Sequence, residues 1–224
     1  MRNRAKLSDF PDVTGYAWGP DVIGQRPQHS VLLMQVIANV SYIENARGHI
    51  LGSMLGTSAF FALRVYMEIK SRDGKRRALK SIAKDVLSED EAKLLLEIEK
   101  KSQSCIDMRD AFAHGIWATC EQLPDAILRV PADKFLGELF DEKPNPEIFL
   151  VGHVHHRDID VFSTSDLQTI EEESRRALLA YNSFSMLVSI QRQFLHENAE
   201  ASWRQIGLRH KERIMPGLLG YLKD

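Results

Sequence analysis

An arginine and a histidine five positions apart, Arg109 and His114, are the residues of this chain best suited to chemistry on an anionic group. On an ideal helix of about 3.6 residues per turn, Arg109 lies about 20° from Ile98, near the centre of an apolar stripe. A guanidinium in that position keeps its charge, so it needs a carboxylate, a set of acceptors or an anionic ligand. Asp110 is adjacent in sequence and should point elsewhere, so we expect it to be a poor partner for Arg109.

The side chains of Arg109 and His114 do not face each other on one straight helix. His114 follows by five residues, which places it about 140° around the helix from Arg109. The two would converge if the helix unwinds at His114 and Gly115. They would also converge if two copies of the helix face each other across a symmetric dimer.

The segment from Met108 to Gly115, MRDAFAHG, resembles the signature of HEPN domains. That signature is an arginine, a polar residue, a few further positions and a histidine, late in a long helix of a small antiparallel bundle. In many members of the family two protomers pair so that both motifs line one cleft, where RNA is cut without a metal. The likeness is specific over about ten residues and is accompanied by the bundle-like pattern from 29 to 115.

The resemblance implies a role for each residue of the motif. Arg109 would stabilise the charge that builds on a phosphate in its pentavalent transition state. His114 would take or orient the proton of the ribose 2′-hydroxyl, and Asp110 would hold or polarise one of the two. The products would be a 2′,3′-cyclic phosphate and a 5′-hydroxyl. The resemblance further implies a homodimer, an RNA substrate, a cognate antitoxin or nucleotidyltransferase as partner, and no metal or cofactor.

Two hypotheses of different class follow from the motif. The leading one is a HEPN-like, metal-independent RNA endonuclease in a toxin or phage-defence setting. In the alternative, Arg109 ties the bundle together through a buried ion pair and His114 is a capping residue, since a fold alone does not give a function. The protein would then be a non-catalytic ligand-binding or protein-interaction module. Catalysis requires that Arg109 and His114 be open to a groove, whereas the alternative allows both to be buried.

Lys75, Arg76 and Arg77 lie in the most densely basic stretch of the chain, which we expect to be a turn. One interpretation is a patch that contacts RNA phosphates. The other is a solvated loop that enters a helix.

His153 and His155 would lie on the same face of a strand, where two imidazoles could bind a metal. No third ligand is fixed by the sequence. We therefore predict an exposed strand and no metal site.

Length and composition fit an ordinary globular protein. The chain has 224 residues, of which 44% are hydrophobic and 27% are charged. Its formal net charge is −2, so no overall field draws it to nucleic acid or to an anionic membrane. Two cysteines give no disulfide framework. The start of the chain lacks the apolar core of a secretory signal. No uncharged stretch reaches the ~20 residues that span a bilayer. These two observations predict a cytoplasmic protein without a membrane anchor.

The spacing of apolar residues predicts a mainly α fold, an antiparallel bundle of four to five helices with a small β-hairpin or strand insertion. We expect an irregular leader over 1–28 whose aromatic residues dock onto the body, a single HEPN-like domain over 29–198 with a β-rich insertion at about 116–162, and a tail over 199–224. The first expected helix begins at His29 and is apolar nearly all round, so we expect it to be buried. A break near Gly48 separates it from a helix over 50–69, and a Ser88–Glu91 capping box begins a third helix that runs to about His114. Further along the chain we expect strands at 116–119, 126–130 and 148–154, a long helix from Ser165, and a short helix near Trp203 that ends at Pro216.

Two further expectations concern glycines. Gly52 and Gly56 are four residues apart and would allow another helix to approach closely. Gly115 is the residue type expected just past a helix end.

Overall fold

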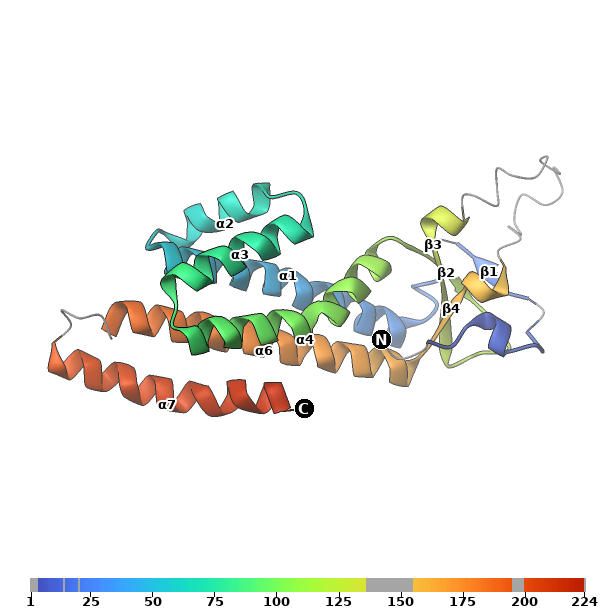
Figure 1. The fold of residues 1–224 in the computed structure, drawn as a ribbon. Coiled ribbons are helices and arrows are strands. Elements are labelled where there is room, and N and C mark those ends of the chain that lie inside the picture. Colours follow the sequence, from blue (N-terminus) through green and yellow to red (C-terminus); the bar gives the residue numbers. More distant parts are fainter. Residues whose placement is uncertain (1–3, 14, 20, 136–154, 195–199, 224) are drawn as a thin grey trace. The chain divides into compact units, whose positions relative to one another are not determined.

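A computed structural model describes residues 4–13, 15–19, 21–135, 155–194 and 200–223. Helix accounts for 73% of it, and the four strands form one antiparallel sheet (Figure 1). The α-helices with described bounds are α1 (Pro27–Leu55), α2 (Ala59–Glu68), α3 (Arg72–Val86), α4 (Glu89–Ala113), α6 (Thr164–Phe194) and α7 (Ala201–Lys223). The strands are β1 (Ala17–Trp18), β2 (Gly115–Thr119), β3 (Ala126–Pro131) and β4 (Asp160–Ser163).

The chain divides into two compact units, and the division falls within α1, α4 and α6. The sheet unit consists of Met1–Ala38 and Ser104–Glu172, and the helical unit consists of Asn39–Gln103 and Glu173–Asp224. The mainly α class is confirmed. The six helices above exceed the four to five that we expected, and the bundle arrangement and the single-domain division stay predictions.

The sheet unit is built around the predicted hairpin. Its strands follow the order β1-β2-β3-β4, and all neighbours are antiparallel. The pairing of Ile116 with Val130 confirms the hairpin of β2 and β3. Ala17 in the leader pairs with Thr119, so the leader contributes an edge strand and is not wholly irregular. The expected strand at 148–154 lies outside the described residues, and β4 was not predicted.

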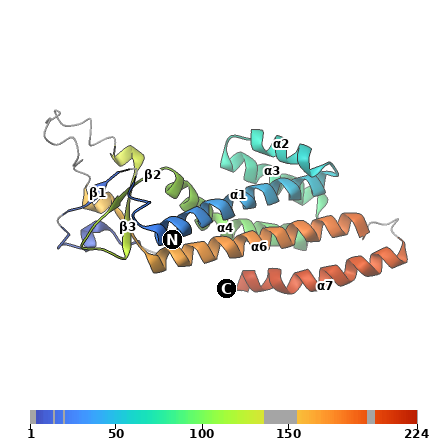
Figure 2. The same cartoon turned by 180° about the vertical axis from the view of Figure 1, so that it is seen from behind.

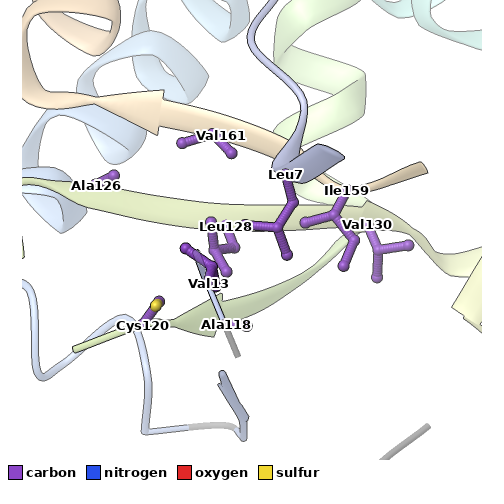
Figure 3. Packing of buried hydrophobic residues seen from close by; sticks show 9 residues of the cluster. All are labelled: Leu7, Val13, Ala118, Cys120, Ala126, Leu128, Val130, Ile159 and Val161. Atoms are coloured by element: carbon purple, nitrogen blue, oxygen red, sulfur yellow. The ribbon is translucent and has the colours of Figure 1, made fainter. Parts of the chain in front are cut away.

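The two faces of this sheet are covered by different parts of the chain. The leader covers one face, where the side chain of Leu7 points toward Leu128 and Ile159 and Val13 lies beside them (Figure 3). Tyr16 and Trp18 pack against the same cluster, so the predicted docking of the leader aromatics is confirmed. The helices cover the other face through a second buried cluster made of Val22, Leu33, Val36, Met108, Phe112, Trp117, Ile127, Phe162 and Leu167.

The helical unit contains the hairpin of α1 and α2 with α3 beside α2, in both views (Figures 1 and 2). The break predicted near Gly48 is wrong, because α1 continues to Leu55 and the chain turns at Gly56, which has φ of +71°. A Cβ atom on Gly48 would lie 2.5 Å from Cδ1 of Leu63. Gly52 likewise faces the backbone of Ala59, so the expected close approach at Gly52 is confirmed and the glycines of α1 accommodate α2.

Serines begin most of these helices. The predicted capping box is confirmed, since the Glu91 amide donates to Oγ of Ser88 at 3.4 Å and the Ser88 amide donates to the Glu91 carboxylate at 3.2 Å. An unpredicted second box joins Ser163 and Asp166 at the start of α6, with distances of 3.0 and 3.2 Å. Ser71 caps α3 by accepting from the amide of Gly74. Local hydrogen bonding therefore sets where these helices begin.

Two expectations about single helices are wrong. In α1, Val31 and Met34 are 56% and 61% exposed, because the helix buries only one stripe of its apolar surface. The C-terminal helix is neither short nor ended by Pro216, since α7 runs through that residue to Lys223. Proline removes one helix hydrogen bond, but the fully buried Leu218 anchors the turn that follows it.

None of the helices among the described residues is by itself long and apolar enough to span a membrane. Taken together, α1 and α2 have the necessary length and composition, but the two are bent by 119° at the break between them.

Candidate functional site

The Arg109–His114 motif lies at the C-terminal end of α4 in the sheet unit. Ala113 is the last helical residue, and the amide of His114 still donates to the carbonyl oxygen of Asp110 at 3.1 Å. The helix therefore does not unwind before His114. Because the helical bonding is retained, the angular separation of about 140° between Arg109 and His114 also holds within one chain.

Arg109 is paired with its sequence neighbour. Its Nη1 lies 3.0 Å from Oδ1 of Asp110, so our expectation that Asp110 would be a poor partner is wrong. The long arginine side chain carries its charged end far enough from the backbone to reach round to the next residue. The pair is not buried, since the side chains are 36% and 41% exposed. Nε of Arg109, by contrast, is buried and has no hydrogen-bond partner among the described residues.

His114 is exposed, although it lies between two buried aromatic residues, Phe112 and Trp117. Phe112 and Trp117 are buried in the cluster between helices and sheet, with ring centroids 5.7 Å apart. The backbone before and after His114 is therefore fixed by packing while its imidazole faces solvent. An exposed imidazole on a rigid backbone is suited to proton transfer with a bound ligand.

Arg129 of β3 holds the end of α4 in place. Its Nε donates to the carbonyl oxygen of Ala111 at 2.7 Å. A Cβ atom on Gly115 would lie 2.7 Å from that Nε and 3.0 Å from the same carbonyl oxygen. Gly115 lies just past the end of α4, as predicted, but it does not have a positive φ. Glycine is required here because the Arg129 side chain passes directly over it.

Three cations surround one buried carboxylate beside this helix end. Asp160 of β4, whose side chain is 5% exposed, accepts from Nη1 of Arg129 at 2.8 Å and from Nζ of Lys6 at 2.7 Å. Nη1 of Arg4 lies 3.8 Å from the same carboxylate. Burial lowers the pKa of Arg129, and the charge of Asp160 opposes this shift without cancelling it. The group has an excess of positive charge, in the same unit as the motif.

This cluster was missed by sequence reasoning. Its members are distant in the chain, since Arg129 and Asp160 are 31 positions apart and Lys6 and Asp160 are 154 positions apart. One signal was available: Arg129 interrupts an otherwise apolar strand, and a charge at such a position requires a buried partner.

The predicted basic patch lies in the helical unit and is not a turn. Lys75, Arg76 and Arg77 are all in α3, which begins at Arg72. Lys75 is only 17% exposed, and its Nζ lies 2.8 Å from Oε2 of Glu44 and 4.8 Å from the ring centroid of Tyr66. Arg76 and Arg77 are exposed. Lys75 is therefore part of the packing, and only the two arginines present their charge to solvent.

The most deeply buried charges of the helical unit form a separate network. Arg47 donates from Nε and Nη2 to the two oxygens of Glu99 at 2.8 and 2.7 Å, and both side chains are almost fully buried. The hydroxyl of Tyr181 donates to the same carboxylate at 2.8 Å. Burial alone would raise the pKa of Glu44, but the hydrogen bond from Lys75 and the charge of Arg47 hold that pKa below its usual value. Each of these side chains bonds to another member of the network, so the network ties helices together within the helical unit.

Among the described residues, no three His, Cys, Asp or Glu side chains lie close enough to hold a metal ion. His155 is exposed at the start of a short 3-10 helix, and His153 lies outside the described residues. No protein family, no curated protein and no solved structure matches the chain. The function of the protein is therefore inferred from the geometry of the chain and from the motif.

Proposed function

We propose that the protein is a HEPN-like, metal-independent RNA endonuclease that uses Arg109, Asp110 and His114. The observation that supports it most is the exposure of these residues at one helix end. Arg109 is paired with an exposed carboxylate rather than locked to a buried one, and His114 faces solvent. A purely structural arginine would be expected to bond a buried partner, as Arg47 does with Glu99 in the other unit.

The proposed reaction is an internal phosphoryl transfer. His114 takes the proton of a ribose 2′-hydroxyl as the 2′ oxygen attacks the adjacent phosphorus. The bond from phosphorus to the 5′ oxygen breaks, and the leaving oxygen takes up a proton from a water molecule. The products are a 2′,3′-cyclic phosphate and a 5′-hydroxyl. Arg109 stabilises the extra negative charge of the pentavalent phosphate, and it does so better than lysine because its planar fork matches two phosphate oxygens.

Two copies of the chain are required by this proposal. The helix keeps its bonding to His114, so one chain holds Arg109 and His114 on different sides of α4. A two-fold axis near the end of α4 would bring Arg109 of one chain toward His114 of the other. We therefore propose a homodimer with the motif at its interface.

The remaining residues have supporting roles in the proposal. Asp110 orients the guanidinium of Arg109, to which it is bonded. Arg129 is a positioning residue, because it bonds the last turn of α4 without belonging to the motif. Arg76 and Arg77, which are on α3 of the helical unit and not part of the motif, contact other phosphates of the RNA. Such an enzyme would act in the cytoplasm as a toxin or in phage defence. A cognate antitoxin or nucleotidyltransferase would control it.

The test is cleavage of RNA in EDTA by the purified wild-type protein beside Arg109→Ala and His114→Ala. We expect cutting by the wild type alone, with 2′,3′-cyclic phosphate ends, and loss of about a hundredfold or more in each variant. Arg209→Ala and His210→Ala are matched controls, since both residues are exposed on α7. Cleavage that persists in the motif variants would contradict the proposal. Absence of cleavage in the wild type, with both motif variants less stable, would favour the non-catalytic binding module.

A further inference from the structure

Helix α2 presents two phenylalanines to solvent. Phe60 and Phe61 are 65% and 62% exposed, and their ring centroids are 5.7 Å apart with the planes at 72°. Val65, on the same helix, is 64% exposed, while Ala62 and Tyr66 bury the opposite side. Adjacent exposed aromatic rings are costly to leave in water, so such a patch is a sign of an interaction surface.

Charged residues interrupt this apolar surface. On a helix of about 100° per residue, Phe60 and Phe61 are about 100° apart, and Arg64 and Glu68 lie between them at about 40° and 80°. Both charged residues are exposed. The outward face of α2 is therefore an alternation of aromatic and charged groups rather than a continuous apolar stripe.

The surrounding segment is strongly basic. Residues 57–86, which contain α2 and α3, have eight lysines and arginines against three acidic residues, a formal charge of +5 in a chain whose total is −2. The two helices lie side by side (Figures 1 and 2), and Nζ of Lys75 lies 4.8 Å from the ring centroid of Tyr66. Arg76 and Arg77 of α3 and Arg64 of α2 are exposed. Positive charge and exposed aromatic rings thus occur together on one helical hairpin.

We propose that α2 and α3 bind unpaired RNA, with Phe60 and Phe61 stacking on bases and Arg64, Arg76 and Arg77 contacting phosphates. Stacking on aromatic side chains beside a basic groove is how proteins hold single strands without reading their sequence. Paired bases cannot stack in this way because their faces are already covered. The choice of RNA as the ligand rests on the proposed function.

An anionic membrane is the competing ligand for an aromatic and basic surface. A helix that lies in a membrane interface buries a continuous apolar face and keeps its charges at the edges. Arg64 and Glu68 lie within the exposed face of α2, so insertion of Phe60 and Phe61 would also bury these two charges. The alternation therefore favours stacking on bases over insertion into lipid.

The experiment measures RNA binding by fluorescence anisotropy in a His114→Ala background, so that no cleavage occurs. The probes are a single strand of about ten nucleotides and the same sequence as a duplex. We expect the single strand to bind more tightly, and Phe60→Ala/Phe61→Ala to raise its Kd about tenfold or more. Arg76→Ala/Arg77→Ala should raise the Kd and flatten its salt dependence by about 1.4 units of log Kd per log salt, since about 0.7 is expected for each phosphate contact to a single strand. Glu68→Lys should lower the Kd.

Matched controls exist elsewhere in the helical unit. Leu179→Ala/Met186→Ala removes exposed apolar surface from α6, where both residues are 55% exposed, and should leave the Kd unchanged. An unchanged Kd in Phe60→Ala/Phe61→Ala, equal affinity for the duplex, or binding to vesicles of phosphatidylserine and phosphatidylcholine without binding to RNA would each overturn the inference. Wild-type protein that binds single strands through these residues but cuts none would contradict the proposed nuclease and not the binding surface.

Discussion

Nε of Arg129 and the carbonyl oxygen of Ala111 are joined by a 2.7 Å hydrogen bond, which connects β3 to the last turn of α4. The same guanidinium bonds Asp160 through Nη1. This side chain therefore bonds the helix end that carries Arg109 and His114 to the sheet, in addition to the packing of Phe112 against Trp117. This bond also explains the glycine at 115, since any larger residue would occupy the space of the guanidinium.

Replacement of Arg129 should destabilise the sheet unit. We expect Arg129→Ala to lower the free energy of unfolding by about 2–3 kcal/mol, somewhat less than is usual for a broken buried ion pair, because Lys6 still pairs with Asp160. Arg129→Lys keeps the positive charge but loses the planar guanidinium that bonds both Ala111 and Asp160. It should therefore lower the free energy of unfolding by less than Arg129→Ala does. Denaturant titration measures both, with Arg209→Ala as the exposed control. A loss of less than 0.5 kcal/mol, the range of ordinary surface substitutions, would show that the bond to Ala111 is unimportant.

Gly115→Ala should also be destabilising. The added Cβ would lie within 3.0 Å of Arg129 and of the Ala111 carbonyl oxygen, and we expect a loss of about 1–3 kcal/mol from the forced displacement. Gly217→Ala is the opposite case, since nothing lies within 4 Å of its Cβ position inside α7. That substitution should stabilise the protein by about 0.5–1 kcal/mol. Thermal unfolding of both variants compares the two effects, and equal shifts in Tm would contradict the close approach of Arg129.

The buried pair of Arg47 and Glu99 should show strong coupling. Arg47→Met leaves a buried carboxylate without its main partner and should cost about 3–5 kcal/mol. Glu99→Leu should cost somewhat less, because Arg47 still pairs with Glu44 at 2.7 Å. The double variant should cost clearly less than the sum, because neither charge is left unpaired. A double-mutant cycle from denaturant titrations gives the coupling energy, and additive losses would contradict the pairing.

Glu44 should make stability dependent on acid pH. Its pKa is lowered in the folded protein, so its contribution is full above the unfolded value of about 4.5 and is lost as the pH falls through the folded pKa. We expect Glu44→Gln to cost about 1 kcal/mol at pH 7, the upper end of the range for exposed ion pairs, because only 20% of the side chain is exposed. The difference from wild type should shrink below about pH 4.5. Free energies of unfolding measured from pH 7 to pH 3 check this, and a gap that widens in acid would give the wrong sign.

The proposed dimer predicts complementation between inactive variants. If the cleft is shared, a mixture of Arg109→Ala and His114→Ala chains contains heterodimers with an intact arginine on one chain and an intact histidine on the other. The mixture should then cut RNA when neither variant does alone. The control is each variant alone at the same total protein concentration as the mixture. A mixture as inactive as its components would contradict a site shared between chains.

Local signals in the sequence predicted local structure well. The Ser88–Glu91 box placed the start of α4 correctly, and the alternation around residues 116 and 130 predicted the hairpin. The failures came where a distant residue decides the outcome. Glycine disfavours helix, so Gly48 was predicted to be a helix break. It lies inside α1, where its lack of a side chain leaves room for Leu63 of α2. Pro216 similarly lies inside α7, where burial of Leu218 favours continuation of the helix.

The motif, its position at the end of a long helix and the angular separation of Arg109 from His114 could all be read from the amino-acid sequence, because they depend on backbone geometry and on residues close in the chain. The pairing of Arg109 with Asp110, of Lys75 with Glu44, and of Arg129 with the helix end became visible only in the folded chain. A long charged side chain can reach several partners, and which one it bonds depends on what the fold buries beside it.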